Sequence, residues 1–393
     1  MRWHSLKRGW IWSLAALLAL LALGMLAAAL TRRSPEPMRS AAIGEWETDP
    51  AVWGRGFPRQ YRSWLESQES SRADIGYGPG RTRWGGDRSA DPGTAHLFAG
   101  YAQSKDHQDL PSRHPAVCQD CHDPRTLGLR VSRRPFLEAM GRRGIDVGKA
   151  TRQELRSYVC AQCHGTHSVY GENAGPRLPW DRGFNIDDII ATYSADGGGF
   201  SDWTHALSKA SMIRLRHPEF ELWSQGIHAA RGVTCADCHM PQVVEGSMRF
   251  SGHQLKSPLL GGGTSSCRTC HHWSVREFQT QVELIQERTA ALQKRAVTAL
   301  ADAHAALGAC VQAGLAQQQL VALQSRLRDA QMRWDFVASD HSCGFHAPQE
   351  AARALAIAID QARQVERDAQ ILRLKAKIPE ELPKDSLSPS LRH

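Results

Sequence analysis

The sequence predicts a mainly α-helical fold, with short helices and loops in the first two thirds and long helices towards the C-terminus. Two observations predict it. Four copies of one cysteine motif begin at residues 118, 160, 235 and 267, and their unequal spacing excludes a simple tandem repeat. From residue 275 onward the chain is rich in Ala, Leu, Gln and Glu, and its apolar residues recur at helical spacing.

The repeated motif is Cys-x-x-Cys-His, which is the form that attaches haem c. The two thiols add to the vinyl groups of the porphyrin, and the histidine is placed to bind the iron from one side. A zinc ribbon, a redox pair or disulfides would also use paired cysteines, but none of these explains a histidine after every second cysteine. We therefore expect four covalently bound haem c groups, and a core packed with haem.

The eight attachment cysteines are Cys118, Cys121, Cys160, Cys163, Cys235, Cys238, Cys267 and Cys270, and the iron ligands that follow them are His122, His164, His239 and His271.

The charge balance argues against nucleic-acid binding. The formal net charge is +8, but residues 1–40 carry six basic residues against Glu36 alone. Four haems would add about eight propionate carboxylates, so the rest of the chain is expected to be near neutral or mildly acidic. The sequence also has no basic patch interleaved with aromatic residues.

Residues 1–30 are expected to be a membrane anchor or a signal segment. The run from Trp10 to Leu30 is apolar and uncharged, and it is long enough to span a bilayer as a helix. A cleaved signal peptide has a shorter apolar core, of about 7–15 residues, although Ala27-Ala28-Ala29 would provide a cleavage site. We favour an anchor at residues 10–30 that holds a periplasmic body at the inner membrane, and residues 31–50 form its tether.

The exported body divides into a haem-binding region at 51–274 and a long-helix region at 275–378, with a flexible tail at 379–393. A short helix is expected around Tyr61–Ser67. The long helices are expected at 275–312, 317–338 and 348–376. They either pack on the haem core or form the interface of a homodimer. Cys310 and Cys343 would lie at opposite ends of the second helix, roughly 30 Å apart, so no disulfide is expected between them.

A series of short motifs along residues 55–365 carries a resemblance to one family. These motifs are Phe57-Pro-Arg-Gln-Tyr61-Arg-Ser-Trp64, Ala99-Gly-Tyr101, Cys160-Ala-Gln-Cys163-His164, Phe200-Ser-Asp-Trp203, His217-Pro-Glu219, Gly226-Ile227-His228, Cys235-Ala-Asp-Cys238-His239-Met240-Pro241, Arg333-Trp334-Asp335 and His346-Ala-Pro348. In them the chain resembles the ammonia-forming, pentahaem cytochrome c nitrite reductases (cytochrome c552). The resemblance implies four haems with two histidine ligands each, and a catalytic haem bound by lysine in a Cys-x-x-Cys-Lys motif.

This chain departs from that pattern. It has no Cys-x-x-Cys-Lys motif, and only 16 residues separate Tyr101 from Cys118, where the catalytic haem segment and a substrate-binding arginine of the family would lie. We therefore expect the chain to lack the lysine-ligated haem.

The resemblance also implies the distal iron ligands. His114 corresponds to the ligand of the haem at Cys160 and Cys163, and His228 to that of the haem at Cys267 and Cys270. His253 corresponds to the ligand of the haem at Cys118 and Cys121, and His346 to that of the haem at Cys235 and Cys238. We expect His96, His205 and His304 to be ordinary hydrogen-bonded histidines.

In the active-site pocket the resemblance is weaker. His217 matches the active-site histidine of the family. Arg214-Leu215-Arg216 replaces a Lys-x-Gln run that helps to hold calcium, and Thr166 and His167 stand where a calcium-binding Glu and the catalytic Tyr would be. Two guanidinium groups would repel a cation, so calcium is not expected.

Three functions remain open at this point. The first is a periplasmic tetrahaem cytochrome that relays electrons from a membrane quinol-oxidising donor or a soluble cytochrome, because iron with two histidine ligands has no free position. The second is a reductase of nitrite, hydroxylamine or a sulfur oxyanion, in which His217, His167 and Arg214 or Arg216 supply protons and bind the anion. The third is a subunit that conducts electrons to a separate catalytic partner.

Overall fold

The computed structural model describes residues 17–25, 43–72, 97, 99, 116–169, 176–195, 200–259 and 265–376. The chain divides into two compact units, Met1–Gly44 and Glu45–His393. In the first unit, residues 17–25 form an exposed helix within the apolar run of 10–30, and the rest of that run lies outside the described residues. No helix among the described residues has the length and apolar character needed to cross a membrane.

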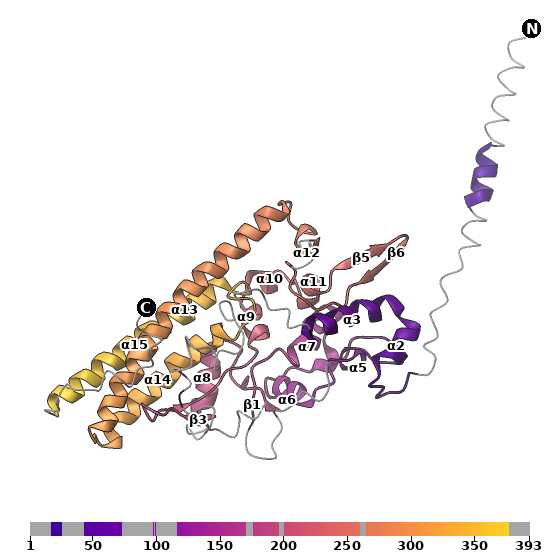
Figure 1. Ribbon diagram of the computed structural model, residues 1–393. Coiled ribbons are helices and arrows are strands. Elements are labelled where there is room, and N and C mark those ends of the chain that lie inside the picture. Colours follow the sequence, from indigo (N-terminus) through magenta and orange to yellow (C-terminus); the bar gives the residue numbers. More distant parts are fainter. Residues whose placement is uncertain are drawn as a thin grey trace, which may run out of the picture. The chain divides into compact units, whose positions relative to one another are not determined.

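The second unit is built mainly of helices (Figure 1). Its helices are α2 (Pro50–Gly56), α3 (Pro58–Arg72), α5 (Cys118–Cys121), α6 (Arg134–Arg142), the 3₁₀ helix η4 (Val147–Lys149), α7 (Arg152–Ala161), α8 (Ile186–Ala195), α9 (Glu219–Ser224), α10 (Ile227–Ala230), α11 (Cys235–His239), α12 (Ser265–Arg268), α13 (Val275–Gln312), α14 (Gln317–Ala338) and α15 (Pro348–Lys375).

The strands in the described residues are short and pair as three antiparallel hairpins, which were not predicted. They are β1 (Ser168–Val169) with β2 (Pro176–Arg177), β3 (Trp203–Thr204) with β4 (Ser211–Met212), and β5 (Gln242–Glu245) with β6 (Met248–Ser251). The expected mainly helical fold, with short helices followed by long ones, is confirmed.

The three C-terminal helices pack side by side and lie close to their predicted positions (Figure 1). Ser274 caps α13 by accepting from the amide of Glu277, whose carboxylate bonds back to Ser274, and Pro348 occupies the first turn of α15. Small buried residues, many of them alanine, let the helices approach closely, and α8 and the β3–β4 hairpin join the same apolar core.

The helix at the start of the body is longer than expected. Tyr61–Ser67 was predicted as a short helix, but it is the middle of the 15-residue helix α3. Pro58 starts this helix, because proline fits the first turn, where its missing N–H costs no hydrogen bond. The sequence is largely polar here and gave only a weak periodic signal.

The four helices that carry the cysteine motifs contact one another in chain order. Between α5 and α7, the Gln162 side-chain amide donates to the Asp120 carbonyl at 2.8 Å. Between α7 and α11, the Cys235 amide donates to the Ser157 hydroxyl at 3.4 Å. The Ser266 hydroxyl of α12 donates to the Cys238 carbonyl of α11 at 2.9 Å. The motifs therefore form a row in the order α5, α7, α11, α12.

His205 and His304 are hydrogen-bonded core residues, as predicted. Their rings stack with centroids 3.7 Å apart, and both are buried. His304 bonds to the Ser208 hydroxyl at 2.9 Å and to the Gln331 side chain at 2.8 Å. His96 lies outside the described residues.

Cys310 and Cys343 are buried free thiols in separate surroundings. The Cys310 thiol points at the Ala369 carbonyl on α15, and the Cys343 thiol points at the His341 carbonyl in the loop before that helix.

Gly226, which precedes α10, packs directly against the backbone of the loop before α15. A Cβ atom at this position would overlap the carbonyl oxygen of His346, and backbone cannot move aside as a flexible side chain can. We expect Gly226→Ala to lower the free energy of unfolding by roughly 1–3 kcal/mol through overpacking. Chemical unfolding of the holoprotein measures this. Gly141→Ala on α6 is the control, because its Cβ would meet nothing within 4 Å; equal effects of the two changes would contradict the prediction.

Candidate functional site

Three pairs of the histidines proposed as iron ligands face each other. The ring centroids of His122 and His253 are 6.3 Å apart. The same distance is 6.4 Å between His228 and His271. It is 6.5 Å between His239 and His346. Each pair joins a motif histidine to the distal histidine that the resemblance assigned to the same haem.

These separations fit an iron atom between the two rings. Metal–imidazole bonds are about 2 Å long and each ring centre lies about 1 Å further out, so two imidazoles on opposite sides of one metal have centres about 6 Å apart. The attachment cysteines of the same motifs carry free thiols, as covalent attachment requires. The residues present therefore fit haem at these three places.

The ring nitrogens that face away from these pairs are held by the backbone. The Nδ1 atom of His122 bonds to the Leu127 carbonyl at 3.0 Å, and that of His239 to the Lys256 carbonyl at 3.1 Å. The Nδ1 atom of His253 bonds to the Ser251 carbonyl at 2.8 Å. Such bonds fix the tautomer with Nε2 unprotonated, which is the form that binds a metal.

His346 differs, because its outer bond goes to a carboxylate. Its Nδ1 atom lies 2.9 Å from Oδ1 of Asp340, whose side chain is fully buried. The Ser342 hydroxyl donates to the other oxygen of Asp340, and the Ser342 amide donates to Oδ1 at 3.2 Å. Asp340 therefore both organises the loop before α15 and orients the His346 ring.

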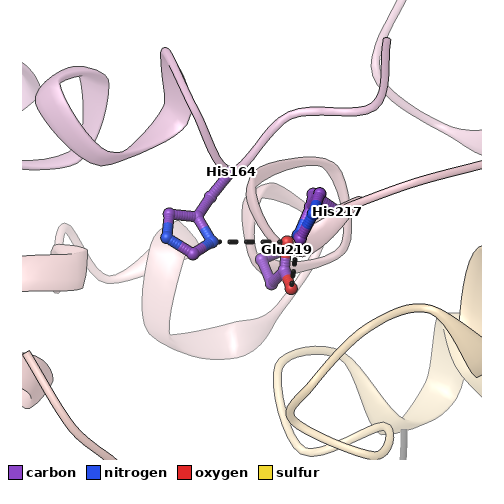
Figure 2. Close-up of side chains that lie close together, drawn as sticks. All are labelled: His164, His217 and Glu219. Carbon is purple, nitrogen blue, oxygen red and sulfur yellow. Dashed lines mark ion pairs between the residues drawn. The ribbon is translucent and has the colours of Figure 1, made fainter. Parts of the chain in front are cut away.

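The fourth motif histidine, His164, lies in a different environment. Its proposed distal ligand, His114, lies outside the described residues. Its Nδ1 atom is 3.6 Å from Oε2 of Glu219, while Nδ1 of His217 is 4.0 Å from Oε1 of the same carboxylate (Figure 2). His341 also donates to Oε1 of Glu219.

The imidazoles around Glu219 are arranged as a stack. His217 lies between His167 and His341, with ring centroids 6.4 Å and 5.7 Å away and with nearly parallel planes. We call His164, His167, His217, Glu219 and His341 the histidine cluster. The structure thus places the two candidate catalytic residues, His167 and His217, beside each other and beside a haem-motif histidine.

The electrostatics of the histidine cluster favour an anionic carboxylate beside a neutral ring. Burial alone would raise the pKa of Glu219, but the adjacent imidazoles of His164 and His341 outweigh it and hold that pKa well below its usual range. Burial lowers the pKa of His217 to about 4, so this ring is neutral at neutral pH. His217 also has φ +53°, a left-handed conformation that is costly for a non-glycine residue and is typical of functional sites.

Glu221 lies two residues after Glu219 on α9, and its carboxyl group is also buried. The Trp180 indole donates to its Oε1 atom at 2.8 Å and the Thr166 amide at 2.7 Å. Burial nevertheless dominates and raises the pKa of Glu221 to about 8. Because it accepts from the Thr166 amide, Glu221 positions the segment that carries His164 and His167.

Among the described residues, His164, His217 and Glu219 are the only group of three whose ligand atoms lie close enough together to share a metal ion. The orientation of His164 gives a simpler reading. Its Nδ1 atom faces the carboxylate, as expected for a haem ligand whose outer nitrogen is supported by a second residue. We therefore interpret Glu219 as a support for His164.

Of the two arginines considered for anion binding, Arg214 is buried and already paired, so it is not available to a substrate. Its side chain is 2 % exposed and forms an ion pair with Asp335, which is equally buried. Arg214 also donates to the Ser339 hydroxyl at 3.1 Å. Arg216 is more accessible, and its guanidinium lies 3.9 Å from the Asp202 carboxylate.

Three residues of the site were not predicted from the sequence: Glu219, Asp340 and His341. Glu219 was visible in the His-Pro-Glu motif, but nothing marked it as a partner of His164. Asp340 and His341 lie near His346 in the sequence, but their spacing matches no known site motif. His341 contacts Glu219 across 122 positions, and Glu219 contacts His164 from a different segment, which a single sequence does not display. Asp340 is close to His346 in sequence, but only the fold shows that it is buried beside that ring.

Comparisons with known proteins agree on the family. The family model for cytochrome c552 matches residues 49–114 and 109–386. The cytochrome c-552 of Bacteroides fragilis is 32 % identical over 428 positions, covering 91 % of this chain and 85 % of the relative. The cytochrome c-552 of Porphyromonas gingivalis is 30 % identical and covers 91 % of this chain and 84 % of the relative.

A solved structure shows the same fold. Cytochrome c nitrite reductase from Desulfovibrio desulfuricans superposes with a TM-score of 0.72 at 24 % identity, covering 88 % of this chain and 92 % of that one. Together with the matched sequence motifs and the paired histidines, these similarities lead to one conclusion: the chain belongs to the cytochrome c552 family.

Proposed function

We propose that this chain is a tetrahaem cytochrome that relays electrons along four haems with two histidine ligands each. The observation that carries the proposal is the set of three facing histidine pairs, each at a separation that fits one iron. Haem iron supplies one-electron chemistry by alternating between the ferric and ferrous states. Iron with both axial positions filled by imidazole suits electron transfer without substrate binding.

The order of the motif helices supports a single path. The Cys235 amide at the start of the third motif donates to the Ser157 hydroxyl of the helix that carries the second motif. The Cys238 carbonyl accepts from Ser266 in the next motif helix. Adjacent attachment points bring adjacent haems close together, so the haem at α5 and the haem at α12 form the two ends of the relay.

The sequence supports the absence of a fifth, lysine-ligated haem. No Cys-x-x-Cys-Lys motif occurs in the 393 residues. The match to the Bacteroides fragilis relative extends over 428 positions, more than this chain contains, so that relative has residues that this chain lacks.

We also propose that this chain binds no calcium beside the histidine cluster. The nitrite reductase from Desulfovibrio desulfuricans is described as a catalytic subunit with two calcium sites. In this chain Arg214 and Arg216 take the place of the Lys-x-Gln run that helps to hold calcium in the family. Arg214 is a buried positive charge paired with Asp335, and Arg216 is a second positive charge. Calcium requires six to eight oxygen ligands, and two guanidinium groups oppose it.

The expected location is the periplasm, where this c-type cytochrome family resides. We propose that residues 10–30 anchor the chain at the inner membrane, where a quinol-oxidising protein or a soluble cytochrome would donate electrons. A homodimer through the long helices, or a separate catalytic partner at one end of the relay, is compatible with this role.

A second function, reduction of nitrite or hydroxylamine to ammonium, is favoured by the histidine cluster. His167 and His217 stack beside Glu219 next to a haem-motif histidine, and His217 is held in a strained conformation. Such groups would serve proton transfer if one haem had an open axial position.

Spectroscopy of the holoprotein separates the two functions. The relay predicts four haems per chain, only low-spin ferric signals, no spectral change with nitrite, and no nitrite reduction with a reduced viologen dye. A high-spin haem or nitrite turnover would contradict it and support the reductase. His217→Ala then identifies the role of that residue: an unchanged spectrum excludes it as an axial ligand, and loss of nitrite turnover, if turnover is found, makes it a catalytic residue.

A further inference from the structure

The outer contacts of the proposed iron ligands differ systematically along the row of haems. At the haem of Cys118 and Cys121, His122 and His253 both bond to backbone carbonyls. Within the described part of the chain, neither these two histidines nor His228 and His271 contact a carboxylate. These four histidines belong to the two outer haems.

The two inner haems each have a buried carboxylate next to one ligand. Asp340 lies 2.9 Å from Nδ1 of His346, and its side chain is fully buried. Glu219 lies 3.6 Å from Nδ1 of His164, and its Oε2 atom has no hydrogen-bond partner in the described structure. Both carboxylates are therefore directed at a histidine from the side opposite to the iron.

A buried negative charge next to an axial imidazole favours ferric iron. The carboxylate makes the imidazole a stronger electron donor, and it also interacts directly with the additional positive charge of the ferric state. Burial strengthens the effect, because water screens a buried charge poorly. Arg133 lies near the second motif but is already paired with Asp120 at 3.0 Å. His341 donates to Oε1 of Glu219, which leaves Oε2 directed at His164.

We propose that Glu219 and Asp340 lower the reduction potentials of the two inner haems, so that the first electrons to enter the protein reside on the two outer haems. The inference rests on the proposed relay and its axial ligands. The relay would then hold electrons most favourably on the two outer haems, and electrons would pass between them through two inner haems of lower potential. Glu219 and Asp340 are positioning residues, because they act through His164 and His346.

The test is a potentiometric titration of the holoprotein followed by electron paramagnetic resonance. We expect Asp340→Asn to shift one of the four one-electron components towards easier reduction by about tenfold, which is 59 mV. Glu219→Gln should shift a different component by a similar factor, and the double variant should shift both. Asp360→Asn and Glu283→Gln, exposed on α15 and α13, are the matched controls. Shifts no larger than those of the controls would overturn the proposal.

Two further measurements keep the proposal testable if a variant folds poorly. Asp340→Glu retains the carboxylate and should retain the low potential, in contrast to Asp340→Asn. In the unchanged protein, the ferric signals of the outer haems should disappear first on reduction, and disappearance of the inner signals first would overturn the inference. A wrong number of haems, or a high-spin signal in the unchanged protein, would instead refute the proposed relay itself.

Discussion

Replacing His253 by methionine is expected to raise the reduction potential of one haem by on the order of 100 mV. Changes of axial ligand alter haem potentials over a range of about 0.8 V. His253 faces His122 at a ring separation of 6.3 Å and is held by the Ser251 carbonyl. Thioether sulfur donates less charge than imidazole, so it stabilises ferrous iron relative to ferric iron. The affected haem should be the one attached at Cys118 and Cys121.

The result is read from the same potentiometric titration, with the change confined to one of four components. His253→Ala provides a second reading, because removal of the ligand should convert one low-spin haem to high spin. His272→Ala is the matched control: this histidine follows the fourth motif directly and is exposed, and no ligand role is proposed for it. If His253→Ala leaves all four haems low-spin, His253 is not an axial ligand.

The long helices were predictable because their determinants are local. Each has a periodic apolar face, and Ser274, Glu277 and Pro348 mark where two of them begin. The attachment cysteines and motif histidines were equally visible, since haem attachment needs a fixed spacing within five residues.

The arrangement of the site was not predictable in the same way. The pairing of motif and distal histidines depended on resemblance to a family, because nothing in the spacing of His253 or His346 selects a haem. The histidine cluster joins segments near residues 164, 217 and 341, and its charges depend on burial that only the fold creates. Arg214 was misjudged for the same reason, since its partner Asp335 lies 121 positions away.

The pair of Arg214 and Asp335 should be the most sensitive point of the core outside the haem sites. Both side chains are 2 % exposed. Asp335 also accepts from the Leu215 amide at 2.7 Å, which ties the segment before His217 to α14. Removing one member leaves an unpaired charge in the interior, so Arg214→Met should lower the free energy of unfolding by about 3–5 kcal/mol.

Chemical unfolding of the holoprotein, followed through the haem spectrum, measures this loss. The double variant Arg214→Met with Asp335→Leu should recover a large part of it, because two apolar groups leave no buried charge, and the recovery separates the charge effect from lost packing. Arg363→Met on α15 is the control, since its pair with Asp302 lies at the surface, and such pairs contribute about 0–1 kcal/mol. If the double variant is less stable than Arg214→Met alone, the ion pair is not the reason for the loss, and the two residues instead act separately through their bonds to Ser339 and Leu215.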